Sequence, residues 1–125
     1  MQLIECFHTA LLVTDLQKAE DFYSNVLGLT KIDRSLNYPG IWYQIGNFQL
    51  HLIVDSTIST DVHNGEKLGR NPHLAFTVAD LEAAKTQLIA GNYCVQPSAS
   101  GRAALFTKDP DNNIIELTQE VKNFL

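Results

Sequence analysis

Three histidines and one glutamate stand at positions whose spacing repeats along the chain. His8 and His73 are 65 residues apart, and so are His51 and Glu116. Neutral imidazole and carboxylate groups suit Zn²⁺, Fe²⁺, Ni²⁺, Mn²⁺ or Co²⁺. One such residue on its own is more typical of a hydrogen-bonded boundary position, but the shared spacing favours a metal site. We therefore predict a divalent metal centre with these four ligands and open positions for substrate oxygens.

The spacing belongs to a longer internal repeat. Residues 8–19 (HTALLVTDLQKA) and 73–84 (HLAFTVADLEAA) are identical at six of twelve positions, and the same offset aligns 47–53 with 112–118. One duplication in a chain of 125 residues predicts two similar modules packed as a single domain. We expect modules 1–55 and 72–125, joined by the polar loop 56–71.

Each module has the pattern of a strand, a helix and three further strands. Asp15 and Asp80 are suited to cap the helices at the N-terminus, and Gly28 and Gly91 to end them in a left-handed conformation. The result is an α+β fold of two βαβββ modules. The strands expected after each helix cover 29–33, 41–45 and 48–54 in the first module, and 92–96, 102–107 and 113–119 in the second.

Alternation along the strands separates two faces of each sheet. One face is apolar and suits a covering helix, whereas the face with the four predicted ligands is small and polar, as in a cavity lining. Gln49 shares the face of His51, and Arg102 shares a face with Phe106. Trp42 and Tyr43 are neighbours, so only one can face the cavity. We predict substrate contacts from Trp42, Gln49, Phe106 and Arg102, a solvated surface charge being the alternative for the arginine.

Composition narrows the classes of partner. The chain has a net charge of -5, and its nine Lys and Arg residues are scattered, which argues against nucleic acid or an anionic membrane surface. No apolar run approaches the 18 or so residues of a membrane span. Two cysteines without CxxC spacing and the lack of a signal-like start predict a soluble, reduced, cytoplasmic protein. Small molecules are the expected ligands.

Three segments carry a resemblance to a known family. HTALLVTDLQKAEDFYSNVLGL, NPHLAFTVADLEAA and ALFTKDPDNNIIEL are similar to motifs of the vicinal oxygen chelate superfamily, which includes glyoxalase I, extradiol dioxygenases, methylmalonyl-CoA epimerase, and fosfomycin and bleomycin resistance proteins. The resemblance implies paired modules whose sheets curl into a cup around a divalent metal held by His8, His51, His73 and Glu116. It also implies a homodimer, with the cup formed within one chain or between two.

The resemblance implies more than one activity. Glyoxalase I typically has a carboxylate at the position of His51 and a basic residue at that of Asn25, whereas extradiol dioxygenases use two His and one Glu, here His8, His73 and Glu116. The expected function is lyase or isomerase chemistry on vicinal oxygens chelated by the metal, with Glu116 or His51 moving the proton. The alternatives are an extradiol-type dioxygenase and a metal-free binding protein of the bleomycin-resistance type.

Overall fold

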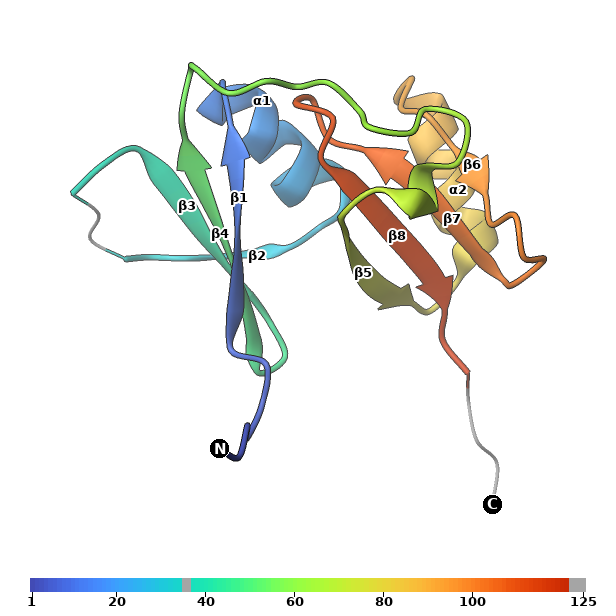
Figure 1. Ribbon diagram of the computed structural model, residues 1–125, viewed down its shortest axis with the longest axis horizontal. Coiled ribbons are helices and arrows are strands. Elements are labelled where there is room, and N and C mark those ends of the chain that lie inside the picture. Colours follow the sequence, from blue (N-terminus) through green and yellow to red (C-terminus); the bar gives the residue numbers. More distant parts are fainter. Residues whose placement is uncertain (35–36, 122–125) are drawn as a thin grey trace. The chain divides into compact units, whose positions relative to one another are not determined.

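The computed structural model describes residues 1–34 and 37–121, and its ribbon is drawn in Figure 1. The chain divides into two compact units, Met1–Ser59 (unit 1) and Thr60–Leu125 (unit 2). Each unit is a βαβββ module with its own four-stranded mixed sheet, so the predicted fold class is confirmed. Within the described residues, no helix has the length and apolar character needed to cross a membrane.

Unit 1 follows the predicted order of elements closely. Its elements are β1 (His8–Val13), α1 (Leu16–Glu20), the π-helical turn η1 (Asp21–Val26), β2 (Thr30–Ile32), β3 (Gly40–Ile45) and β4 (Phe48–Val54). The sheet order is β1-β4-β3-β2, with β1 parallel to β4 and the other pairs antiparallel. Asp15 caps α1 by accepting a hydrogen bond from the Lys18 amide, and Gly28 has a φ of 73° where the helical segment ends.

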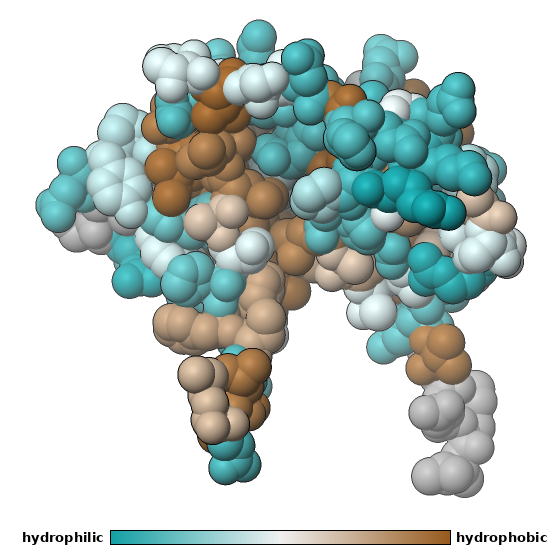
Figure 2. Space-filling model, in the orientation of Figure 1, coloured by the Kyte–Doolittle hydropathy of each residue, from teal (hydrophilic) through white to brown (hydrophobic). Residues whose placement is uncertain are grey.

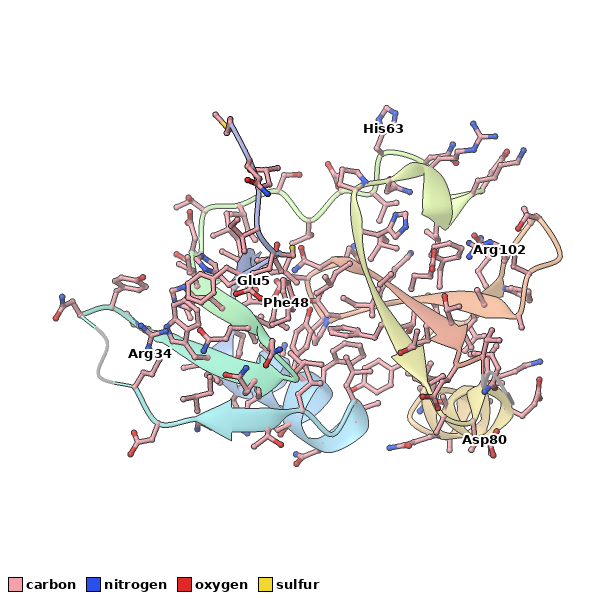
Figure 3. All side chains as sticks on the ribbon, turned by 90° about the horizontal axis from the view of Figure 1, so that it is seen from below. Glu5, Arg34, Phe48, His63, Asp80 and Arg102 are labelled. Carbon is pink, nitrogen blue, oxygen red and sulfur yellow. The ribbon has the colours of Figure 1, made fainter. Side chains whose placement is uncertain are left out.

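Unit 2 repeats this topology with two departures from prediction. Its elements are the 3₁₀ turn η2 (Leu68–Arg70), β5 (His73–Val78), α2 (Leu81–Ala90), β6 (Gln96–Pro97), β7 (Ala104–Lys108) and β8 (Ile114–Gln119), in the order β5-β8-β7-β6. Asp80, labelled in Figure 3, caps α2 as expected. The left-handed residue after α2 is Asn92 (φ 62°), whereas Gly91 has a φ of -86°, so that prediction was wrong. Because the chain turns through Asn92, pairing begins only at Gln96, and the strand expected over 92–96 is short.

In each unit the helix lies against the sheet (Figure 1), and the buried core side chains fill the space between them. The buried side chains on this packed face include Leu50 and Leu52 in β4 and Ile115 and Leu117 in β8. The two parallel pairs have equivalent registers, because Ala10 lies beside His51 and Ala75 beside Glu116. The predicted ligands therefore stand on the opposite, open face.

Tyr43 and Trp42 point to opposite faces of the unit 1 sheet, as predicted. Tyr43 is fully buried against the helical segment of unit 1, where its hydroxyl shares a 2.8 Å hydrogen bond with Ser24, whereas Trp42 stacks on His51. Burial raises the pKa of Tyr43 above its ordinary value of 10.0, although the Ser24 hydrogen bond opposes the shift.

Replacing Tyr43 by Phe should lower the free energy of unfolding at neutral pH by about 0.5–1.5 kcal/mol, the usual net value of one hydrogen bond. Since the folded-state pKa is raised, this advantage of Tyr43 should be present below about pH 10 and should shrink as the pH rises through the folded pKa. Urea denaturation of both proteins at several alkaline pH values measures the difference. A difference that stays constant above pH 10 would contradict the buried phenol.

Candidate functional site

A histidine and a glutamate of unit 2 face each other across two adjacent strands. His73 begins β5, Glu116 lies within β8, and His73 Nε2 is 3.5 Å from Glu116 Oε1. The His73 side chain is 26% exposed and that of Glu116 is 10% exposed, so both are partly shielded from solvent. We call His73 and Glu116 the C-terminal pair.

The Asn71 backbone decides which nitrogen of His73 carries the proton. His73 Nδ1 is 2.7 Å from the carbonyl oxygen of Asn71. Because a carbonyl oxygen only accepts, Nδ1 carries a proton, and in the neutral form of the ring Nε2 is then the atom whose lone pair faces Glu116. Two electron-rich atoms repel at this distance unless a cation bridges them or the ring is protonated. The separation suits one metal ion, since two ligand atoms at about 2.0–2.2 Å from an ion lie within about 4.4 Å of each other.

Two neighbours keep Glu116 ionised. Thr118 Oγ1 donates a 2.8 Å hydrogen bond to Glu116 Oε2, and Arg102 Nη2 lies 3.4 Å from Oε1. Burial alone raises the pKa of Glu116, but the hydrogen bond from Thr118 and the hydrogen bond and charge of Arg102 outweigh it, so the pKa lies below the ordinary 4.5. The carboxylate is thus anionic at neutral pH, with one oxygen held by a hydroxyl and the other turned to His73.

A pocket of about 450 Å³ opens beside the C-terminal pair. Its lining carries three positive charges: Lys67 just before η2, Arg70 at the end of η2, and Arg102 in the turn before β7. Among the described lining residues, Glu116 contributes the one carboxylate. Figure 2 shows hydrophilic side chains gathered over the part of unit 2 that carries η2. In a chain with a net charge of -5, this local positive excess favours an anionic ligand.

The other two predicted ligands meet in unit 1. The ring of His51 stacks on Trp42 with centroids 4.0 Å apart, and the ring of His8 approaches the same indole edge-on at 5.4 Å. His51 is 4% exposed, and its buried Nε2 has no hydrogen-bond partner among the described residues. Burial first, and then the positive charges of His8 and Arg34, lower the pKa of His51 below 6.5, so the ring is neutral at neutral pH. We call His8 and His51 the N-terminal pair.

The donor types of both pairs, imidazole nitrogen and carboxylate oxygen, suit a divalent metal. A buried ring nitrogen without a partner costs about 1–3 kcal/mol, and coordination would remove that cost at His51. Within the described residues, no group of three or more His, Cys, Asp or Glu side chains is arranged to hold a metal ion. The structure therefore brings the four predicted ligands together as two pairs, one in each unit.

The four predicted substrate residues lie in different surroundings. Phe106 and Arg102 line the pocket beside the C-terminal pair. Trp42 lines a smaller pocket of about 270 Å³ in unit 1. The Gln49 amide is engaged within unit 1, because it donates to Gln44 at 2.9 Å and accepts from Arg34 at 3.4 Å.

Lys67, Arg70 and Thr118 were not among the predicted site residues. The two cations lie in the polar loop 56–71, and their place in the pocket lining depends on how η2 packs. Alternation does place Thr118 on the face of Glu116, two residues away on the same strand.

Known proteins resemble this chain along most of its length. The sequence profile of the Glyoxalase/Bleomycin resistance protein/Dioxygenase superfamily matches residues 6–117. A protein of Vibrio cholerae serotype O1 named "Probable lactoylglutathione lyase" is 30% identical over 121 residues, covering 90% of this chain and 88% of the relative. A lactoylglutathione lyase of Neisseria meningitidis serogroup A is 34% identical over 128 residues with the same coverage.

A solved structure shares the fold. The glyoxalase/dioxygenase of Nostoc punctiforme superposes with a TM-score of 0.76 at 22% identity, covering 94% of this chain and 92% of that chain. The profile match spans both βαβββ units, including the strands that carry the N-terminal and C-terminal pairs. The chain therefore belongs to the glyoxalase/bleomycin resistance protein/dioxygenase superfamily, which is the vicinal oxygen chelate superfamily.

Proposed function

We propose that this protein is a metal-dependent enzyme of the lyase or isomerase type, acting on a small anionic substrate with two neighbouring oxygens. The observation that carries the proposal is the C-terminal pair, in which the Asn71 carbonyl fixes Nδ1 of His73 as a donor and Nε2 lies 3.5 Å from an ionised Glu116 oxygen. The curated relatives named lactoylglutathione lyase support lyase chemistry.

The proposed metal ligands are His8, His51, His73 and Glu116. We infer that the N-terminal and C-terminal pairs serve one ion, either within one chain or between the two chains of a homodimer. The ion is Zn²⁺, Fe²⁺, Ni²⁺, Mn²⁺ or Co²⁺, since imidazole nitrogen and carboxylate oxygen suit each of them. When bound, the metal supplies a Lewis acid that stabilises negative charge on two adjacent substrate oxygens.

Glu116 is the proposed base. Its lowered pKa keeps it ionised at neutral pH, so once it detaches from the metal it can accept a proton at Oε1, while the Thr118 hydroxyl holds Oε2. His51 is the second group that can take up a proton, because its ring is neutral. A carboxylate and an imidazole that both reached one substrate would be able to move a proton between two neighbouring carbons, as an isomerase or a lyase requires.

Arg102 is the proposed anion-binding residue. Its guanidinium reaches Glu116 with Nη2 and donates through Nε to Ser100 at 3.2 Å, so the side chain is directed across the pocket. Lys67 and Arg70 add charge to the same lining. Together they would hold a carboxylate or phosphate group of the substrate with its oxygens near the C-terminal pair.

Replacing His73 by Ala should remove most of the bound metal, because the neighbouring side chains offer no other nitrogen donor on that face of β5. The measurement is elemental analysis of untagged protein, as metal per chain, with circular dichroism to confirm folding. His63→Ala is the matched control, since His63 lies exposed in the segment before η2 and points away from the sheet in Figure 3. Full metal content in His73→Ala, or depletion in His63→Ala, would show that the metal site is misassigned.

Replacing Arg102 by Met should raise KM for an anionic substrate by about 10- to 100-fold, the value of one charge-assisted hydrogen bond of about 1.5–3 kcal/mol. The assay uses the hemithioacetal of methylglyoxal and glutathione. Lys18→Met is the control, because it removes one positive charge from an exposed position on α1. Equal KM values for the Arg102 variant and the unaltered chain would exclude Arg102 from substrate binding.

A further inference from the structure

Each unit places one buried aromatic ring against its predicted metal ligands. In unit 1 the residue is Trp42, 9% exposed, and in unit 2 it is Phe106, 5% exposed. Both lie on the third strand of their module and stand directly opposite the ligand of the last strand, Trp42 opposite His51 and Phe106 opposite Glu116. The two aromatic residues therefore occupy equivalent positions.

The contacts of the two rings with the first-strand histidines are also equivalent. Trp42 meets His8 edge-to-face with centroids 5.4 Å apart and planes at 72°. Phe106 meets His73 in the same manner, at 5.4 Å and 90°. Edge-to-face contacts at this distance are favourable and directional, so each ring restricts the orientation of one imidazole.

Trp42 restricts a second imidazole. The His51 ring lies flat on the indole at 4.0 Å with an interplanar angle of 11°. The Arg34 guanidinium lies over the indole with its carbon 4.1 Å from the centroid, and because a stacked imidazole already covers one face, it occupies the other. Arg34 is in turn held by Gln49 at 3.4 Å. The indole therefore lies between the Arg34 guanidinium and the His51 ring, and its own plane fixes the plane of the His51 ring.

Phe106 is fixed by different neighbours to the same effect. It packs with Leu68 and Ile114 in a buried cluster. A Cβ at Gly69 would lie 2.7 Å from the Phe106 ring, so the backbone of η2 leaves no room for a side chain between itself and the ring. A ring confined in this way cannot swing aside and release His73.

We propose that Trp42 and Phe106 are equivalent positioning residues, each of which fixes the imidazole orientation that its pair needs to bind metal. The inference rests on the proposed metal function and adds to it two residues that touch no metal themselves. Residues that orient metal ligands through hydrogen bonds typically contribute 10- to 100-fold to metal affinity. The same loss is expected here when either ring is replaced by an aliphatic side chain.

The test is titration of the metal-free protein with Co²⁺, followed by calorimetry and by the visible absorption of the bound ion. Trp42→Leu and Phe106→Leu should each weaken Co²⁺ binding by about 10- to 100-fold and alter the absorption band, because the imidazoles lose their fixed orientation. Trp42→Phe should restore the affinity to within about threefold, since a phenyl ring can still stack on His51 and meet His8. In the unaltered chain, Trp42 is the sole tryptophan, so Co²⁺ binding should also quench the protein fluorescence.

Tyr43→Phe is the matched control for stability. It changes the neighbouring residue on the same strand, on the face packed against the helix, and it should leave Co²⁺ affinity and the absorption band unchanged. Loss of affinity in Tyr43→Phe equal to that in Trp42→Leu would overturn the positioning role, because reduced stability would then explain both.

The remaining outcomes separate the two proposals. If the unaltered chain binds Co²⁺ and both leucine variants match it, the positioning role is wrong and the metal function stands. A loss in only one of the two variants would overturn the equivalence of Trp42 and Phe106. If the unaltered chain binds no Co²⁺, the metal function fails and this inference fails with it.

Discussion

The parallel pairing between the first and last strands of each module is the constraint on which the site depends. In both units this pairing sets a small alanine beside the ligand of the last strand, Ala10 beside His51 and Ala75 beside Glu116. The alternate residues of β4 and β8 are buried under the helix. Because side chains alternate, a slip of one residue would turn the ligands toward the helix and the core side chains toward the other face. Burial of the leucine and isoleucine side chains of β4 and β8 therefore places His51 and Glu116 on the face away from the helix.

The same scaffold produces two different electrostatic environments. In unit 1, burial and neighbouring positive charges keep His51 neutral, which provides a nitrogen lone pair. In unit 2, the hydroxyl of Thr118 and the charge of Arg102 keep Glu116 anionic despite burial. One pair thus offers two imidazole rings, and the other offers an imidazole and a negatively charged carboxylate.

The aromatic residues connect the ligands to the rest of each module. Trp42 and Phe106 belong to the third strand, which contributes no ligand, yet each ring contacts the histidine of the first strand. Packing around these rings differs between the units, with an arginine and a glutamine in one and an apolar cluster with Gly69 in the other. The duplication has kept the position and the contact while the supporting residues have changed.

Local patterns in the sequence determined most of the fold. The strand periodicity, the aspartate caps and the repeat at an offset of 65 predicted both modules, and the DPDNN segment turns through Asn112, with a φ of 63°. These features are readable because each depends on residues close together in the chain. The misplaced left-handed residue after α2 is a local error as well, since Gly91 and Asn92 are both suited to it.

Only the tertiary structure decided the surroundings of the ligands. The turn between β3 and β4 covers residues 46–47, whereas the turn between β7 and β8 covers 109–113. The two hairpins therefore pair differently. An offset of 65 from Trp42 indicates Thr107, but the residue opposite Glu116 is Phe106. Lys67 and Arg70 reach the pocket because η2 packs near β8, and the proton of His73 is placed by a backbone carbonyl. Such contacts depend on turn lengths and strand register across distant segments, which the type and spacing of residues do not encode. The sequence by itself thus determined the four ligand candidates, and the tertiary structure decided what holds, charges and orients them.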